Sequence, residues 1–221
     1  MAYNLLDIQS AIQDDLKDTN FSASRLTRYI NYAQLWIFNT HSFRFCQKAV
    51  SGALTIGSFQ YNQQTDHQST IGGVLIDPVV PKRVFELNKD TYRPHREFFE
   101  SFPDPSSNLA AMPSTWTEYS GQLYFNCPVD KAYTFNQRYY RVPVTLAAAT
   151  DVPTVPEPFR ELLELYAEFR AEGYRGNRDV SVMIEGQMNN MLESMVLRYS
   201  PATMVANPRM RGATVRVDRL F

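Results

Sequence analysis

Helix-like and strand-like hydrophobic patterns occupy separate stretches of this sequence, and their separation most constrains the fold. Apolar residues recur three and four positions apart over residues 5–16, which places them on one helix face, and Asn4 is suited to cap that helix. A second helix is predicted to begin at Ser22 and to end near His41. The same helical spacing returns over residues 157–198. Helices are therefore expected at both ends of the chain.

Residues 44–145 follow a different pattern, in which short apolar or alternating runs are separated by turn residues. Ser120-Gly121 fits the tip of a hairpin. Residues 60–72 are polar and end in glycine, so we expect a mobile loop there. The stretch 97–102 predicts one or two helical turns. The predicted strands are residues 47–56, 73–77, 82–87, 115–120, 122–126 and 132–141.

These patterns predict an α+β protein with a discontinuous helical domain. Residues 1–43 and 156–200 are expected to form one antiparallel helical bundle. Residues 44–155 would be an antiparallel β domain, either a sandwich or barrel-like, inserted between the two helical halves. Residues 201–221 show no helical period and are predicted to form an extended C-terminal arm.

Composition and motifs point away from an enzyme. Hydrophobic residues make up 44% of the chain and charged residues 20%, which is typical of a globular protein. The sequence lacks the glycine-rich phosphate loop, the dinucleotide fingerprint and the common hydrolase motifs. Cys46 and Cys127 do not form a redox or zinc motif. No apolar run is long enough to span a membrane. We therefore expect no catalytic residue, no metal and no cofactor.

The remaining candidates for chemistry have simpler structural interpretations. The three histidines lack metal-ligand spacing. His41 is expected to cap a helix or to pack at its end, His67 to be solvated in the polar loop, and His95 to lie on the surface. Three glutamates of the first C-terminal helix are expected to form a solvated face: Glu161, Glu164 and Glu168.

Positive charge is concentrated at the C-terminal end. Residues 205–221 carry four arginines and one aspartate, although the whole chain has a net charge of −1. Apolar and charged residues alternate at the end of this arm, which is the pattern of a strand that pairs with a partner sheet. The arm either docks on another chain or folds back on its own subunit. Its arginines could pair with phosphate or with carboxylates, and the interleaved apolar residues favour a protein partner. The candidate binding residues are Arg209, Arg211, Val215, Arg216, Val217, Arg219, Leu220 and Phe221.

Several stretches, in order, resemble the head-to-tail adaptor (connector) proteins of tailed bacteriophages. They are "SFRF" at the end of the second helix, then "PKRVFEL", then "YRPHREFFESFPDPSS". The densest match is "MPSTWTEYSGQLYFNCPVDKAYTFNQRYYRVPVTL", and "TDVPTVPEPFRELLELYAEFRAEGYRGN" follows it. Together they span about residues 5–198. The arm departs from the pattern of this family, so its partner is not implied by the resemblance.

The resemblance implies a structural protein of the virion head–tail junction, made in the host bacterial cytoplasm. Such adaptors form a homo-oligomeric ring, typically of twelve subunits, beneath the portal protein. They join the head to a downstream tail protein and line part of the channel for double-stranded DNA. A near-neutral body suits a channel, because a basic wall would hold DNA by releasing its counterions. Independently of the resemblance, we predict that the arm binds the portal or a neighbouring subunit.

Other classes stay open at this point. A different tail protein, such as a tail terminator or a fibre-attachment module, would share the strand-rich middle. A soluble enzyme or a DNA-binding module is disfavoured, since the motif search is empty and the net charge is near zero.

Overall fold

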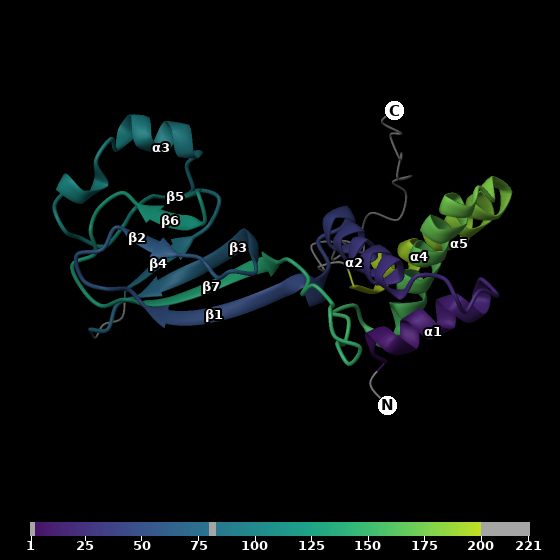
Figure 1. Ribbon diagram of the computed structural model, residues 1–221. Helices are drawn as coiled ribbons and strands as arrows, with labels where there is room; N and C mark the ends of the chain where they lie inside the picture. The colour runs from purple at the N-terminus through teal and green to yellow at the C-terminus, as the bar shows by residue number, and fades with distance from the viewer. Residues whose placement is uncertain (1–2, 80–82, 200–221) are drawn as a thin grey trace, which may run out of the picture.

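The computed structural model describes residues 3–79 and 83–199, which form a helical part and a β part joined end to end (Figure 1). The described chain is mixed α+β. Its helices are α1 (Leu5–Asp15), α2 (Ala23–Thr40), α3 (His95–Ser101), α4 (Arg160–Arg175) and α5 (Arg178–Tyr199). Its strands are β1 (Gln47–Ala53), β2 (Gln60–Asn62), β3 (His67–Ile76), β4 (Val84–Leu87), β5 (Trp116–Tyr119), β6 (Gln122–Phe125) and β7 (Thr134–Arg141).

The first two helices begin where local signals predict. Asn4 and Asp7 form a capping box, in which each backbone N–H donates to the other side chain at 3.0 Å. Ser22 is the N-cap of α2 and His41 its C-cap, so both predicted helices are confirmed. Their apolar faces are buried in one core shared with α4 and α5.

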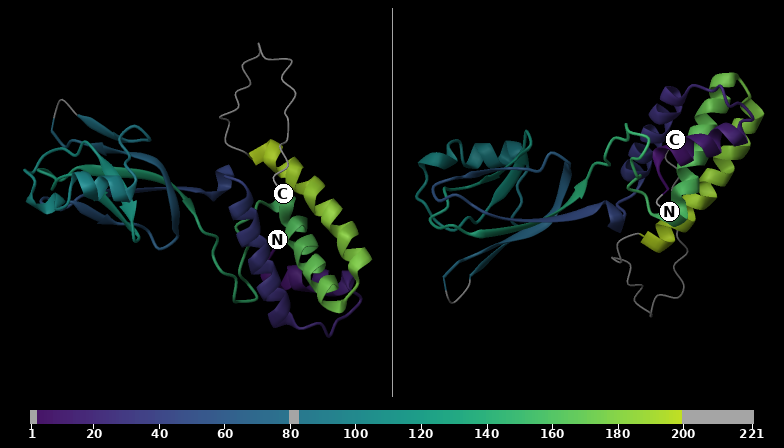
Figure 2. Two further views of the ribbon diagram at one scale, coloured as in Figure 1. Left: turned by 90° about the horizontal axis from the view of Figure 1, so that it is seen from above. Right: turned by 60° about the horizontal axis from the view of Figure 1, so that its bottom comes forward.

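The C-terminal helices are joined by a left-handed turn. Gly176 ends α4 with φ = 85°, a conformation that glycine adopts without steric strain. The predicted helical stretch 157–198 is thus two helices preceded by a short 3₁₀ turn, Glu157–Phe159. In the view from above, α4 lies between α2 and α5, and α1 crosses the other side of α4 (Figure 2).

The β part contains two antiparallel sheets. One has the strand order β1-β7-β3-β4 and the other β2-β6-β5, and neither closes into a barrel within the described residues. Ser120 and Gly121 both have positive φ, as a two-residue hairpin turn requires, which confirms the predicted hairpin of β5 and β6. Each predicted strand overlaps an observed one.

The predicted loop over residues 60–72 is wrong. Residues 60–62 form β2, which pairs with β6, and the first half of β3 pairs with β7. The sequence of these strands shows no apolar alternation, because hydrogen bonds between polar side chains stabilise them in place of apolar packing. For example, Gln137 Nε2 donates to Thr70 Oγ1 at 2.6 Å.

A second core lies between the two sheets. Phe135 and Leu75 of the four-stranded sheet share this core with Leu123 and Phe125 of the three-stranded sheet. The helix α3 lies over the three-stranded sheet and buries Phe98 (Figure 1). The two hydrophobic clusters therefore belong to different parts of the molecule, one helical and one β.

Aromatic side chains fill the junction between the parts. The chain leaves α2 through Phe43 and Phe45, whose rings stack 5.2 Å apart. Tyr199, at the end of α5, packs edge-on against Phe45 at 6.0 Å and against Phe159 at 5.4 Å. Asn31 of α2 also holds the returning segment, because its side chain exchanges two hydrogen bonds with the backbone of Leu146.

Candidate interaction surfaces

The arm residues predicted from the sequence lie outside the described residues. This applies to the whole candidate set, Arg209, Arg211, Val215, Arg216, Val217, Arg219, Leu220 and Phe221. The last described residue, Tyr199, sits among the aromatic rings of the junction. The arm therefore follows a residue that is fixed beside the start of the β part.

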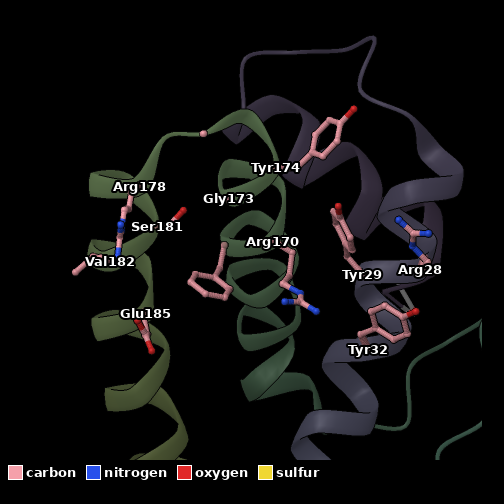
Figure 3. A pocket seen from close by; sticks show the side chains of 12 residues that line it. Arg28, Tyr29, Tyr32, Arg170, Gly173, Tyr174, Arg178, Ser181, Val182 and Glu185 are labelled. Carbon is pink, nitrogen blue, oxygen red and sulfur yellow. The ribbon is translucent and has the colours of Figure 1, made fainter.

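An open groove of about 830 Å³ crosses the helical part between α2, α4 and α5 (Figure 3). We call it the α2–α5 groove. The helix α4 lies between its two neighbours there and contributes the small residue Gly173 to the lining. Most of its lining side chains are aromatic or basic, and Val182 and Glu185 of α5 complete it. The aromatic and basic residues are Arg28, Tyr29 and Tyr32 of α2, Phe169, Arg170 and Tyr174 of α4, and Arg178 of α5.

Arginines in and beside the groove lie over aromatic rings. Arg25, which is not part of the lining, has its guanidinium 3.8 Å from the ring centre of the lining residue Tyr174, which joins α2 to α4. Arg170 lies 5.8 Å from the ring centre of Tyr166. Such cation–π contacts hold the charged groups in place and leave their N–H donors free. The surface is therefore pre-organised for hydrogen bonds to a partner.

The groove carries excess positive charge. Arg28, Arg170 and Arg178 form no ion pair with any described residue. Among the described residues that line it, Glu185 is the only acidic one. Tyrosine and arginine are the residues enriched at protein–protein interfaces. The lining thus fits a protein partner that carries carboxylates.

The opposite side of α4 is acidic. Glu164 and Glu168 are half-buried, so the prediction of a fully solvated face is wrong for them, while Glu161 is exposed as predicted. Burial raises the pKa of both half-buried carboxyls, and neighbouring carboxylates raise it further: Glu168 acts on Glu164, and Asp15 on Glu168. We call Asp15, Glu161, Glu164 and Glu168 the acidic face.

No cation neutralises this acidic face within the described part of the chain. None of its four carboxylates forms an ion pair there. By contrast, Glu172 at the end of α4 is buried beside Arg175, with 3.2 Å between Oε1 and Nη1. Arg175 also donates to the backbone oxygen of Leu16 at 3.1 Å and so ties α1 to α4.

The histidines differ in their surroundings. His41 is exposed at the end of α2, 5.7 Å from the ring of Phe43, and His95 is exposed and stacked on Tyr119. His67 is not solvated, which corrects the prediction. Its side chain is only 6% exposed, and its Nε2 lies 3.1 Å from Thr70 Oγ1 and 3.6 Å from Glu118 Oε1. It bridges the two sheets.

Stability should fall at acidic pH because of His67. Burial lowers the pKa of this imidazole below its usual 6.5, although Glu118 and Asp66 act in the opposite direction. The unfolded chain therefore binds the proton more readily, and the free energy of unfolding decreases as pH falls below about 6.5. We expect His67→Gln to flatten this dependence, by at most about 1.4 kcal/mol per pH unit. Urea titrations between pH 7.5 and 5 measure it. The exposed-histidine control His95→Gln should keep the wild-type slope, and an unchanged slope in His67→Gln contradicts the assignment.

The described residues contain no group of three or more His, Cys, Asp or Glu side chains that could hold a metal ion. None of the described helices is both long enough and apolar enough to span a membrane. The free thiols of Cys46 and Cys127 are buried, and burial raises the pKa of both. They are therefore poor nucleophiles.

A helical part with an aromatic and basic groove fits the class of proteins that bind other chains. Comparison with known families agrees with this class. Residues 3–216 match the family described as SU10 adaptor protein, and the chain belongs to this family of phage head-to-tail adaptors. No curated protein matches the chain. It is thus a structural adaptor protein of a bacteriophage.

The sequence patterns did not predict the groove. Arg28 and Tyr32, four positions apart on α2 and both exposed, are an available signal, because an arginine beside an exposed aromatic on a helix marks a contact surface. That α2 and α5 line the same groove lies beyond such local signals.

Proposed function

We propose that this adaptor assembles as a closed ring of twelve subunits beneath the portal protein, at the head–tail junction of the virion. The ring joins the capsid to a downstream tail protein and forms part of the channel through which double-stranded DNA passes. Membership of the adaptor family over residues 3–216 is the observation that carries this proposal. The protein has a structural role and performs no catalysis.

The two sides of the helical part support a ring. A ring subunit must present two different, complementary side surfaces, because its contacts are heterologous and close by rotation. The α2–α5 groove and the acidic face are two such surfaces, of opposite charge. The overall charge of −1 also suits a channel that does not retain DNA.

The parts of the chain are assigned different roles. The helical segments, residues 1–43 and 156–200, form the body of the ring, and residues 44–155 form a separate domain that faces the tail. Residues 201–221 reach the portal or a neighbouring subunit through Arg209, Arg211, Val215, Arg216, Val217, Arg219, Leu220 and Phe221. A fully extended arm of this length spans up to roughly 70 Å, enough to cross to an adjacent chain.

Portal rings test the proposal directly. Purified adaptor is mixed with assembled portal rings, isolated with them, and imaged by electron microscopy with class averaging. We expect one added ring with twelvefold symmetry. A chain lacking residues 201–221 should keep its circular dichroism spectrum and fail to bind. Sixfold or threefold symmetry, or no binding by well-folded protein, overturns the adaptor role, while normal binding by the truncated chain overturns only the role of the arm.

A further inference from the structure

We infer that the α2–α5 groove receives the acidic face of a second copy of this chain, so that the two surfaces form the contact between neighbouring subunits. This inference rests on the proposed ring and names the surfaces that build it. The contact joins the arginines of one copy to carboxylates of the next.

Charge complementarity indicates which segment binds in the α2–α5 groove. The groove presents Arg28, Arg170 and Arg178 against the single carboxylate of Glu185, so a partner segment must supply acid. The arm of the same chain carries four arginines and one aspartate, and its charge therefore opposes docking in this groove. The acidic face carries four carboxylates with no ion-pair partner in the described chain. It is the complementary surface that this molecule itself offers.

The groove lining favours protein over nucleic acid. Phe169, Val182 and Tyr174 give it apolar and aromatic contact area, and Arg170 is placed near the middle of the groove (Figure 3). Desolvated aromatic and arginine side chains are the groups that dominate binding energy between proteins. DNA phosphates would use the arginines and leave this apolar area unused.

The two surfaces lie on opposite sides of one helix. Glu168 and Arg170 are two residues apart on α4, which corresponds to about 200° around the helix axis. Glu168 lies on the side of α4 against which α1 packs, and Arg170 faces the groove between α2 and α5. A copy docked in the groove therefore leaves its own groove free for the next copy. Such a head-to-tail contact extends into a ring and is not satisfied in a two-fold dimer.

Charge reversal tests the contact on portal rings. The groove variant carries Arg170→Glu and Arg178→Glu, and the acidic-face variant carries Glu161→Arg and Glu168→Arg. Each should reduce the apparent affinity of ring assembly by about tenfold or more, because like charges then meet at every contact. The matched control, Lys89→Glu with Arg93→Glu, places the same charge change on exposed residues of the β part and should assemble normally.

A 1:1 mixture of the two variants gives the decisive result. Every contact in an alternating ring then joins a basic to an acidic surface, and a ring of twelve closes with such alternation. We expect the mixture to assemble like the wild type and either variant alone to assemble at least about tenfold more weakly, with circular dichroism verifying that both are folded. Normal assembly of either variant alone, or failure of the mixture, overturns the inference.

Two further results separate the causes of failure. If wild-type protein forms no ring on portals, the proposed function fails. If the wild type assembles and the variants assemble equally well, only the groove contact fails. A gel shift with duplex DNA that the groove variant abolishes would reassign the groove to DNA and likewise overturn the contact with a second copy.

Discussion

Phe135→Ala should lower the free energy of unfolding of the β part by about 3–5 kcal/mol, which is a large fraction of the roughly 5–15 kcal/mol that stabilises a typical domain. The Phe135 side chain is fully buried in the core between the sheets. In β7 it lies between Gly52 of β1 and Leu75 of β3. Its ring also packs edge-on against Tyr61 of the other sheet, at 4.7 Å. Truncation would thus leave a cavity where the two sheets meet.

The two tryptophans allow each part to be followed separately. Trp116 is buried in the β core, whereas Trp36 packs against the helical core, 5.3 Å from Tyr166. In a Trp36→Phe background, the fluorescence of Trp116 reports the β part, and circular dichroism at 222 nm reports mainly the helices. We expect Phe135→Ala to move only the fluorescence transition in urea.

A helical-core variant provides the matched control. Leu163 is fully buried among the helices, so Leu163→Ala should move the circular dichroism transition and leave that of Trp116 in place. This pair of results tests the proposed domain division, in which residues 44–155 fold as their own unit. Coincident shifts of both transitions in either variant would contradict that division.

Gly73→Ala should destabilise the β part by about 3 kcal/mol or more, through steric overlap and without loss of any contact. A Cβ at this position would lie 2.5 Å from the backbone oxygen of Asn136 and 3.1 Å from the Cα of Gln137. Both atoms belong to β7, which pairs with β1 on one side and β3 on the other. Since backbone atoms cannot rotate away, β3 and β7 would have to separate.

Gly186→Ala is the matched control, because it makes the same glycine-to-alanine change at a position where the added methyl group meets no other atom. Gly186 lies on the exposed side of α5, and a Cβ there meets no atom within 4 Å. We expect this variant to stabilise the helical part by about 0.5–1 kcal/mol, because alanine loses less backbone entropy in a helix. Urea titrations of both variants give the comparison. A wild-type midpoint for Gly73→Ala would show that the strands can accommodate the methyl group.

Local signals predicted most elements of this fold. The capping box at Asn4, the hairpin turn at Ser120-Gly121 and the apolar period of α4 act within a few residues, and each is present in the structure. The segment 60–72 was mispredicted because its strands are specified by partners 60 to 80 positions away. Polar side chains such as Thr70 are half-buried there and form hydrogen bonds, so the sequence shows no apolar alternation.

Most elements and the family could be predicted from residue order, because periodicity, caps and turns depend on neighbouring residues. The interaction surfaces could not, since they form when distant segments pack together. The α2–α5 groove brings together Tyr29, Arg170 and Val182, which lie far apart in the chain. The half-burial of Glu168 depends on the packing of α1 against α4. Burial and charge environment are properties of atoms close in space, and the order of residues along a chain does not set those distances until the core has packed.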